Sequence, residues 1–314
     1  MTGGAGFIGS YVVERLLARG WDVVVLDDFS SGKEEKLAAV IGHKKLRIIR
    51  GSILDGRIVA DALRDVDTIF HEAAVTNVQR SIDDPLTVNR VNVEGTLNLL
   101  DESRRTDVRH FIFASSCSVY GNASVLPISE DSPLAPRNPY AASKAACEHY
   151  CTAYSSTYGL SVVRLRYTNV YGARRAVGPY AGVMLNFAEC LARNKPLPIF
   201  GDGTQTRDFI YSTDVAEATA RSAEYQNIGG AINVGTGVAT SINDLARMMS
   251  EIAGKIDLGT VRAEPRIGEI MHSQADTRLA KNILNFECRV SLREGLGEFL
   301  MWYKSLRATS GTVS

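Results

Sequence analysis

The stretch Thr2-Gly3-Gly4-Ala5-Gly6-Phe7-Ile8-Gly9 places glycines three residues apart, at positions 3, 6 and 9. Because glycine has no Cβ, such a loop lets the backbone come close to a pyrophosphate, and a helix opened by Phe7 and Ile8 directs its first N–H groups at the negative charge. A glycine-rich loop alone also occurs in ordinary surface turns. The residues that follow decide between these two interpretations.

A short apolar strand, Val23–Leu26, follows the loop and ends in Asp27, 18 residues after Gly9. A carboxylate at this position accepts hydrogen bonds from both hydroxyls of an adenosine ribose and repels a 2′-phosphate. Asp28 comes next, and no arginine is adjacent. The sequence therefore predicts a site for NAD rather than NADP.

Short β-branched runs alternate with amphipathic stretches through the first half of the chain, as in βαβ units on a parallel sheet. The predicted strands are Asp22–Leu26, Leu46–Arg50, Thr68–His71, His110–Ser115 and Ser161–Arg166. The predicted helices are Ser10–Arg19, Leu86–Arg104 and Tyr140–Tyr158, and a short strand at Ala231–Val234 and a helix near Leu292–Ser305 come later. We expect an α/β fold with a doubly wound parallel Rossmann sheet over residues 1–168. A smaller substrate-binding lobe should cover residues 169–314, with segments such as 208–235 returning to the first domain.

The start of the chain departs from this pattern, because only Met1 precedes the glycine loop. A buried strand ordinarily comes first in such folds and lies centrally in the sheet. Its absence would leave backbone groups of two neighbouring strands unpaired, at about 1–3 kcal/mol each. We therefore expect either a shortened chain or a destabilised sheet.

Composition excludes several classes of partner. The 314 residues are 45% hydrophobic and 22% charged, with 35 Lys and Arg balancing 35 Asp and Glu, so no net field favours nucleic acid or an anionic membrane. No run reaches the roughly 18 apolar residues of a membrane span, and we expect a cytoplasmic protein. The five cysteines form no CxxC pair, and no His or Cys cluster accompanies Cys147 and Cys151. We expect buried thiols, with no metal site and no disulfide framework.

Tyr140-Ala-Ala-Ser-Lys144 places a phenol and an ammonium one helical turn apart. The lysine is expected to lower the pKa of the tyrosine, so that the phenol acts as a base. Ser116, just after the strand His110–Ser115, supplies a hydroxyl that hydrogen-bonds the same substrate oxygen. The YxxxK pattern is loose, and its alternative is a solvent-facing Tyr and Lys. His71 ends a buried strand, and we expect a core histidine with satisfied hydrogen bonds.

These segments, together with Ala114-Ser-Ser-Cys-Ser-Val-Tyr-Gly121 and Gly201-Asp-Gly-Thr-Gln-Thr-Arg-Asp208, resemble the extended short-chain dehydrogenase/reductase family, and within it the nucleotide-sugar 4-epimerases. The resemblance implies a tightly held NAD that is reduced and reoxidised within one cycle. It also implies that Tyr140 takes the proton of the sugar 4-hydroxyl, that Ser116 orients this hydroxyl, and that Lys144 also holds the nicotinamide ribose. The 4-keto sugar then turns and accepts hydride on its other face.

The resemblance also implies the binding residues. Those for NAD are Gly3, Gly6, Phe7, Ile8, Asp27, Asp28, Ser30, Ser31, Gly32, Ser52, Ile53, Ala73, Ala74, Asn92, Ser115, Tyr140, Lys144 and Tyr167. Those for a UDP-hexose are Ser116, Tyr140, Asn169, Val183, Phe200, Arg207, Arg266, Glu269 and Ser273. Ser52 departs from the family, which usually has an aspartate near the adenine amine, so we expect NAD to be held more weakly. The two arginines match the family's diphosphate ligands.

His272-Ser273-Gln274-Ala275-Asp276 resembles the N-acetylhexosamine epimerases, because a small residue at position 273 admits a 2-N-acetyl group. We expect UDP-GlcNAc and UDP-GalNAc as substrates, with UDP-Glc and UDP-Gal as additional ones. The alternative is that Ser273 only caps a local turn.

Cys117 and Ser118 stand where related dehydratases and decarboxylases place carboxylates, which favours simple epimerisation. A carboxylate from another segment would overturn this argument. A UDP-glucuronate 4-epimerase would need a further cation, such as Arg80, Arg174 or Arg175. A dehydratase or decarboxylase, and a non-catalytic dinucleotide sensor, also stay open. Helices Leu86–Arg104 and Tyr140–Tyr158 match the pair that forms a homodimer interface in the family.

Overall fold

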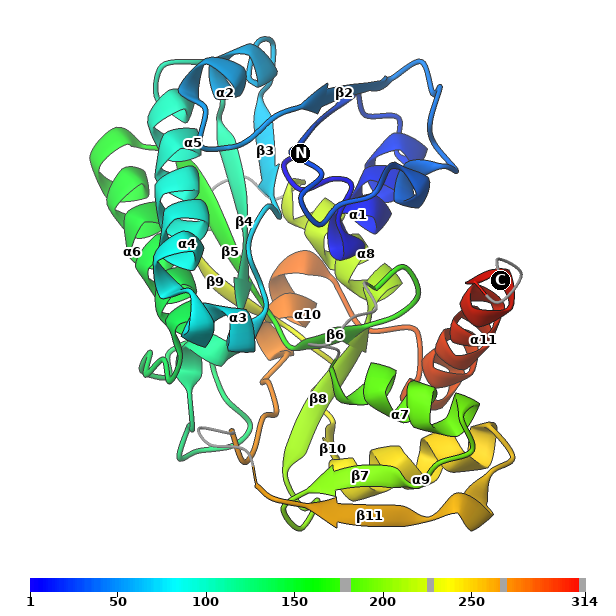
Figure 1. Cartoon of the computed structure of the whole chain (residues 1–314). Helices are drawn as coiled ribbons and strands as arrows, with labels where there is room; N and C mark the ends of the chain where they lie inside the picture. The colour runs from blue at the N-terminus through cyan, green and yellow to red at the C-terminus, as the bar shows by residue number, and fades with distance from the viewer. Residues whose placement is uncertain (176–181, 225–228, 266–269, 311–314) are drawn as a thin grey trace.

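The computed structural model describes residues 1–175, 182–224, 229–265 and 270–310, which form a larger and a smaller lobe (Figure 1). The larger lobe is built on a parallel sheet in which β1 pairs with β2, while β3, β4, β5 and β9 follow one another in that order. The strands are β1 Val23–Asp27, β2 Leu46–Arg50, β3 Thr68–His71, β4 His110–Ser116, β5 Ser161–Tyr167 and β9 Gly230–Val234. The predicted α/β fold with a parallel sheet is confirmed.

The first two residues lie between β1 and β3. Thr2 forms a parallel bridge to both Leu26 and His71, and its N–H donates to the Phe70 carbonyl at 3.0 Å. The Leu26 N–H donates to the Met1 carbonyl at 2.9 Å. Backbone groups at the carboxyl ends of β1 and β3, which were expected to lack partners, are therefore paired where the glycine loop begins.

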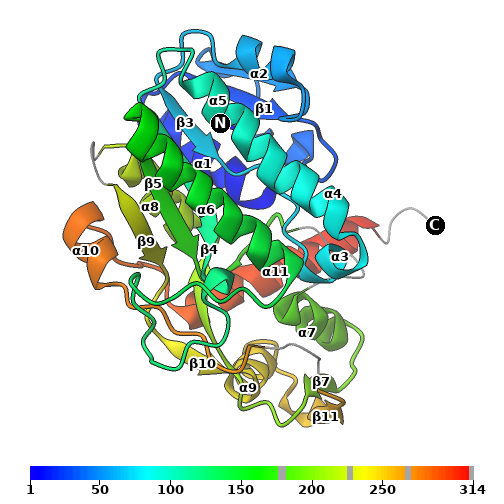
Figure 2. The same cartoon turned by 90° about the vertical axis from the view of Figure 1, so that its left-hand side faces the viewer.

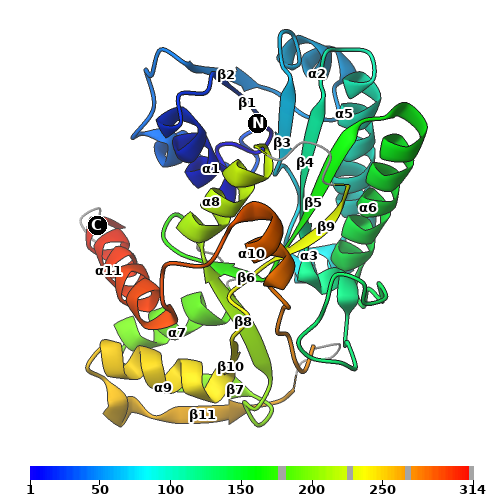
Figure 3. The same cartoon turned by 180° about the vertical axis from the view of Figure 1, so that it is seen from behind.

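Helices cover both faces of this sheet. Helices α1 Phe7–Ala18, α8 Ser212–Ser222 and α10 Arg278–Leu284 lie on one face (Figure 3). Helices α2 Gly56–Ala62, α4 Pro85–Asn89, α5 Gly95–Ser103 and α6 Pro139–Tyr158 lie on the other, with α3 Val78–Asp83 beside α4 and α6 (Figure 2). Each face has its own apolar core, with Val25 and Ile232 in the first and Leu99 and Phe111 in the second.

Within the described residues, the smaller lobe contains two short sheets and three helices. Strand β8 Thr206–Tyr211 lies between β6 Asn169–Tyr171 and β10 Ala239–Ser241, and β7 Leu197–Phe200 pairs with β11 Thr260–Ala263. Helices α7 Val183–Ala192, α9 Ile242–Ile252 and α11 Leu292–Ser310 pack on them around Phe187 and Phe299.

The structure also contains short 3₁₀ turns in both lobes. They are η1 Glu34–Leu37, η3 Cys117–Tyr120 and η4 Ile256–Leu258.

Local chemistry explains the longest helix of the larger lobe. Pro139 occupies the first turn of α6, where its missing N–H removes no helical bond, and Asn138 caps the helix by accepting from the Ala141 N–H at 2.9 Å. Gly159 ends it in the left-handed conformation, with φ at 73°. The predicted helix Leu86–Arg104 is instead α4, a π turn η2 at Arg90–Glu94, and α5.

Candidate active site

The glycine loop connects Thr2, which bridges β1 and β3, to helix α1. Gly3 has a φ of +66°, and a Cβ there would lie 2.7 Å from the Ala73 backbone nitrogen, while a Cβ on Gly9 would overlap the Gly3 carbonyl oxygen. Helix α1 starts at Phe7, and no side chain of the described residues caps its N-terminal N–H groups. This close backbone and uncapped helix end fit the pyrophosphate of a dinucleotide.

Asp27 ends β1 and lies under the loop. Its two oxygens accept from the Ala5 N–H at 2.9 Å and the Phe29 N–H at 2.8 Å, and burial raises the pKa of this carboxyl. A Cβ on Gly32 would lie 2.8 Å from the Asp27 carboxylate. Each carboxylate oxygen accepts more than one hydrogen bond, so the geometry still fits a ribose diol.

Most of the remaining predicted NAD residues lie in the loops after β1, β2 and β3. Asn92, in the π turn, accepts from the Val75 N–H at 2.8 Å and donates to the Val75 carbonyl and to the Ser143 hydroxyl. It therefore holds the loop after β3 against helix α6. The Ser52 hydroxyl accepts from the Leu54 N–H at 3.2 Å. The Asp28 carboxylate accepts from the Ser30 N–H, and the Ala73 N–H donates to the Thr2 hydroxyl. Ser31, Ile53 and Ala74 lie in the same loops as Ser30, Ser52 and Ala73, respectively.

The predicted catalytic residues come together at the end of β4. Tyr140 makes a hydrogen bond with Ser116, yet burial dominates and raises the pKa of the phenol to about 12. The Lys144 ammonium donates to the Ala114 carbonyl at 2.6 Å and lies 4.7 Å from the centre of the Phe113 ring. Lys144 is therefore directed at the strand, and the predicted lowering of the Tyr140 pKa by this lysine is wrong for the protein chain alone.

A carboxylate that the sequence reasoning missed lies beside these groups. The Tyr167 hydroxyl donates to Glu72 Oε1 at 2.7 Å, and Tyr167 Oη lies 2.7 Å from Thr219 Oγ1. Burial raises the pKa of Glu72 to about 7, opposed by the Tyr167 hydrogen bond and the Lys144 charge, and the Glu72 charge raises the pKa of Tyr140. Its signal in the sequence is a carboxylate directly after a buried strand.

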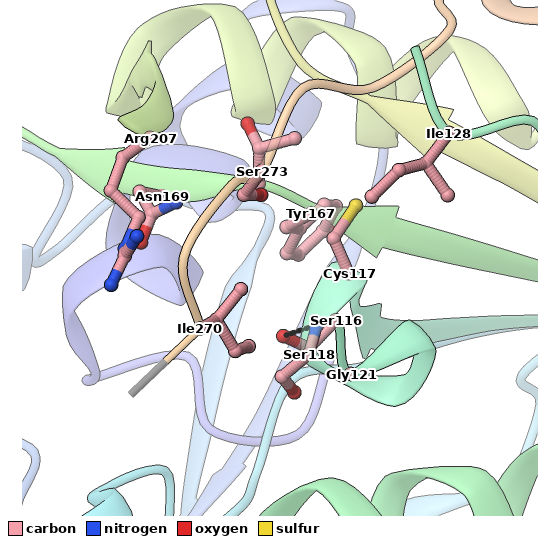
Figure 4. Close-up of a pocket in the computed structure, with 11 residues that line it drawn as sticks. Ser116, Cys117, Ser118, Gly121, Ile128, Tyr167, Asn169, Arg207, Ile270 and Ser273 are labelled. Carbon is pink, nitrogen blue, oxygen red and sulfur yellow. Dashed lines mark hydrogen bonds between the residues drawn. The ribbon is translucent and has the colours of Figure 1, made fainter. Parts of the chain in front are cut away.

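A pocket opens beside Ser116 (Figure 4). Arg207 and Asn169 lie at one end of it and Ser116 and Ser118 at the other, with Ser273 between them along the wall (Figure 4). The full lining is Ser116, Cys117, Ser118, Gly121, Ile128, Tyr167, Thr168, Asn169, Arg207, Ile270 and Ser273. Five predicted residues thus line one pocket.

Other predicted substrate residues lie elsewhere. Val183 starts helix α7 and packs against the core of the smaller lobe, and Phe200 ends β7, and neither lines this pocket. Arg266 and Glu269 fall outside the described residues.

The Ser273 segment is tied to the lobe by Asp208. This buried carboxylate accepts from the backbone N–H groups of Thr236 at 2.9 Å, Gly237 at 2.9 Å and Ala275 at 3.2 Å. Ile128 N–H donates to the Gln274 carbonyl at 2.8 Å. Ser273 is therefore held in the pocket wall from two sides.

A buried ion pair supports the strand that carries Ser116. Arg166 on β5 binds Glu148 on α6 at 2.6 Å, and Glu148 accepts from the Ser115 hydroxyl at 2.5 Å. Arg166 also donates to the Tyr120 hydroxyl at 2.7 Å. These contacts fix the end of β4 that carries Ser116.

The structure also describes the surroundings of His71 and of two cysteines. His71 lies between Thr2 and Thr96, whose hydroxyls are 2.7 and 2.8 Å from its ring nitrogens, as predicted for a satisfied core histidine. Cys147 and Cys151 are buried free thiols. Among the described residues no group of three His, Cys, Asp or Glu side chains could hold a metal, and no helix there is long and apolar enough to span a membrane.

Comparison with known proteins adds family information to this geometry. A family model described as the NAD dependent epimerase/dehydratase family matches residues 1–235. The UDP-glucose 4-epimerase of Mycolicibacterium smegmatis is 38% identical over 307 residues, covering 97% of this chain and 98% of that protein. The UDP-N-acetyl-alpha-D-glucosaminuronate decarboxylase of Bacillus cytotoxicus is 32% identical over 317 residues, covering 98% and 97%. The structure of UDP-N-acetylglucosamine 4-epimerase from Methanobrevibacter ruminantium M1 in complex with UDP-N-acetylmuramic acid superimposes with a TM-score of 0.92 at 36% identity, covering 97% of each chain.

Proposed function

Because the chain belongs to the NAD-dependent epimerase/dehydratase family, of extended short-chain dehydrogenases/reductases, we propose that it inverts C4 of a UDP-hexose, with UDP-GlcNAc and UDP-GalNAc as its preferred pair. UDP-Glc and UDP-Gal are additional substrates. The observation that carries the proposal is the single pocket that combines Ser116 with Arg207, Asn169 and Ser273. It offers hydroxyls at the sugar end and a guanidinium at the diphosphate end.

The chemistry of the pocket assigns a task to each residue. Tyr140 accepts the proton of the 4-hydroxyl and later returns it, and Ser116 holds that oxygen through its hydroxyl. Bound NAD supplies a reversible hydride acceptor for C4 and a positive charge that favours the Tyr140 phenolate. In the protein chain itself, burial and the Glu72 charge raise the pKa of Tyr140 to about 12, opposed by the Ser116 hydrogen bond. Lys144, fixed at the Ala114 carbonyl, places its own positive charge beside the same site.

The choice of epimerisation over elimination rests on Cys117 and Ser118, neither of which is a carboxylate. Glu72 is the nearby carboxylate that would support the competing dehydratase or decarboxylase reaction. However, its carboxylate is already engaged, because it accepts from the Tyr167 hydroxyl at 2.7 Å. A dinucleotide sensor is disfavoured by the assembled Tyr140, Ser116 and Lys144.

A uronate substrate would require a cation for its C6 carboxylate. Arg174 is already paired with Glu14 at 2.8 Å, and Arg80 is exposed on helix α3. Arg175 donates to the Val170 carbonyl at 2.6 Å, and none of these three arginines lines the pocket. We therefore keep neutral sugars as the proposed substrates.

The test is to incubate the protein with UDP-GlcNAc and, separately, with UDP-Glc, with and without added NAD, and to resolve the 4-epimers by chromatography. We expect UDP-GalNAc to form and Tyr140→Phe to lose at least about 100-fold of this activity. A keto-sugar product would instead establish a dehydratase or decarboxylase. No turnover despite bound NAD would favour the sensor.

The N-acetyl preference has its own test in Ser273→Tyr. The added ring should exclude the 2-N-acetyl group and reduce turnover of UDP-GlcNAc by about tenfold or more, while turnover of UDP-Glc is kept as the internal control. An equal loss on both substrates would mean that Ser273 only supports the local turn.

We also propose a homodimer through helix α6 and the continuous stretch of α4, η2 and α5, which lies beside it on one surface (Figure 2). Apolar side chains are exposed there, with Leu86 at 81% and Tyr158 at 54%. Leu86→Glu should convert a dimer to a monomer in sedimentation experiments, whereas Met301→Glu, at an exposed apolar position on α11, should not. A monomeric wild-type protein would contradict the assignment.

A further inference from the structure

Two adjacent arginines follow strand β6 in very different surroundings. Arg174 has a left-handed backbone, with a φ of 65°, and its side chain contacts helix α1 and the η1 turn, where it donates to the Lys36 carbonyl at 3.2 Å. It pairs with Glu14 at 2.8 Å, lies 4.3 Å from the centre of the Tyr11 ring and donates to the Ser10 hydroxyl at 3.4 Å. These contacts pin the turn to α1 and thereby fix the direction of the next residue.

Arg175 has no such acidic partner in the described part of the chain. Its Nη1 donates to the Val170 carbonyl at 2.6 Å, and its guanidinium carbon lies 5.7 Å from the centre of the Phe7 ring. Burial lowers the pKa of this arginine, with no carboxylate to offset the loss of water. A guanidinium has five N–H donors, so most of them are left for another acceptor.

The start of a helix lies on each side of this guanidinium. Phe7 is the first residue of α1, and Gly182, which precedes the first residue of α7, would place a Cβ 3.3 Å from Arg175 Nη2. Both helices begin after a glycine, and no described side chain caps either one. The guanidinium of Arg175, which has no acidic partner among the described residues, therefore lies near the first residue of α1 and beside the residue that precedes α7. The start of each helix carries a partial positive charge.

We propose that Arg175 binds a phosphate group of a nucleotide between the starts of helices α1 and α7. The fork of an arginine and the N–H groups of helix ends together match the several oxygens of a phosphate. The proposal rests on the proposed function, which brings two diphosphates to the protein. One belongs to the nucleotide sugar, the other to NAD.

The experiment compares Arg175→Gln, Arg175→Lys and the matched control Arg193→Gln, which removes the same charge from an exposed helix position. Calorimetry measures binding of UDP to the NAD-loaded protein and binding of NAD to the stripped protein. We expect Arg175→Gln to lower the affinity for one of these ligands by about tenfold or more and Arg175→Lys to lower it less. Arg193→Gln should leave both affinities unchanged.

The affected arm identifies the source of the phosphate: the UDP arm indicates the nucleotide sugar and the NAD arm the dinucleotide. Unchanged affinities in both arms overturn the proposal. A loss of affinity in Arg175→Gln also overturns it if this variant has a lower melting temperature and Arg193→Gln shows the same loss of affinity. If Arg175→Gln does not fold, Arg175→Lys decides, since it keeps the charge but loses the fork. Failure of UDP to bind the unmodified protein refutes the proposed function, and the NAD arm then decides for Arg175 alone.

Discussion

Replacement of Glu72 by glutamine should make the protein more stable at alkaline pH. The pKa of Glu72 is about 7 in the folded protein, against 4.5 for an ordinary glutamate, mainly because burial removes water from the carboxylate. The folded state therefore holds the proton more tightly than the unfolded chain. Stability from this group is fully present below pH 4.5 and is lost as the pH rises through 7, by about 3 kcal/mol in all.

Glutamine has no charge to bury, and its amide oxygen still accepts from the Tyr167 hydroxyl, which lies 2.7 Å from Glu72 in the native protein. The difference in unfolding free energy between Glu72→Gln and the native protein should therefore grow by about 2–3 kcal/mol between pH 5 and pH 8. Urea unfolding at both pH values, at matched NAD content, measures it. Glu94→Gln, at an exposed position, serves as the control. A difference that does not change with pH would refute the assigned pKa of Glu72.

Three further changes test other parts of the site. Gly9→Ala should weaken NAD binding by about tenfold or more in fluorescence titrations, because its Cβ would overlap the Gly3 carbonyl; unchanged binding would show that the loop can shift. Arg166→Met should lower the unfolding free energy by about 3–5 kcal/mol, since it leaves the buried Glu148 charge uncompensated, and urea unfolding checks this value. Asp208→Asn should raise the KM for the UDP-sugar more than it lowers kcat, because three backbone donors lose a charged acceptor; an effect on kcat alone would contradict this.

The sequence predicted the parts of the site that depend on local pattern. Asp27 and Ser116 each follow a buried strand, and the carboxyl ends of parallel strands meet at one edge of a sheet, so their neighbourhood follows from periodicity. The helix that carries Tyr140 and Lys144 was also predicted from the spacing of its apolar residues. These are features in which each residue's role is set by its own segment.

What the sequence missed depends on partners far apart in the chain. Glu72 receives its hydrogen bond from Tyr167, 95 positions later, and only this packing gives it an unusual pKa. The Lys144 ammonium turns to Ala114 rather than to the phenol, which spacing along a helix does not reveal. The π turn at Arg90–Glu94 was also missed, because its apolar positions continue a nearly helical period.

The return of β9 to the large sheet has a consequence for synthesis of the protein. Val163 pairs with Gly230, so the outer edge of β5 is covered only by a strand that follows β6, β7 and β8 in the chain. During translation this edge stays open until about residue 234 has left the ribosome, although β3, β4 and β5 are already available. An open edge with unpaired N–H and C=O groups invites pairing with other chains. The nascent protein should therefore depend on chaperones for this interval, and substitutions that weaken β9 should lower yield more than they lower the activity of the folded molecules.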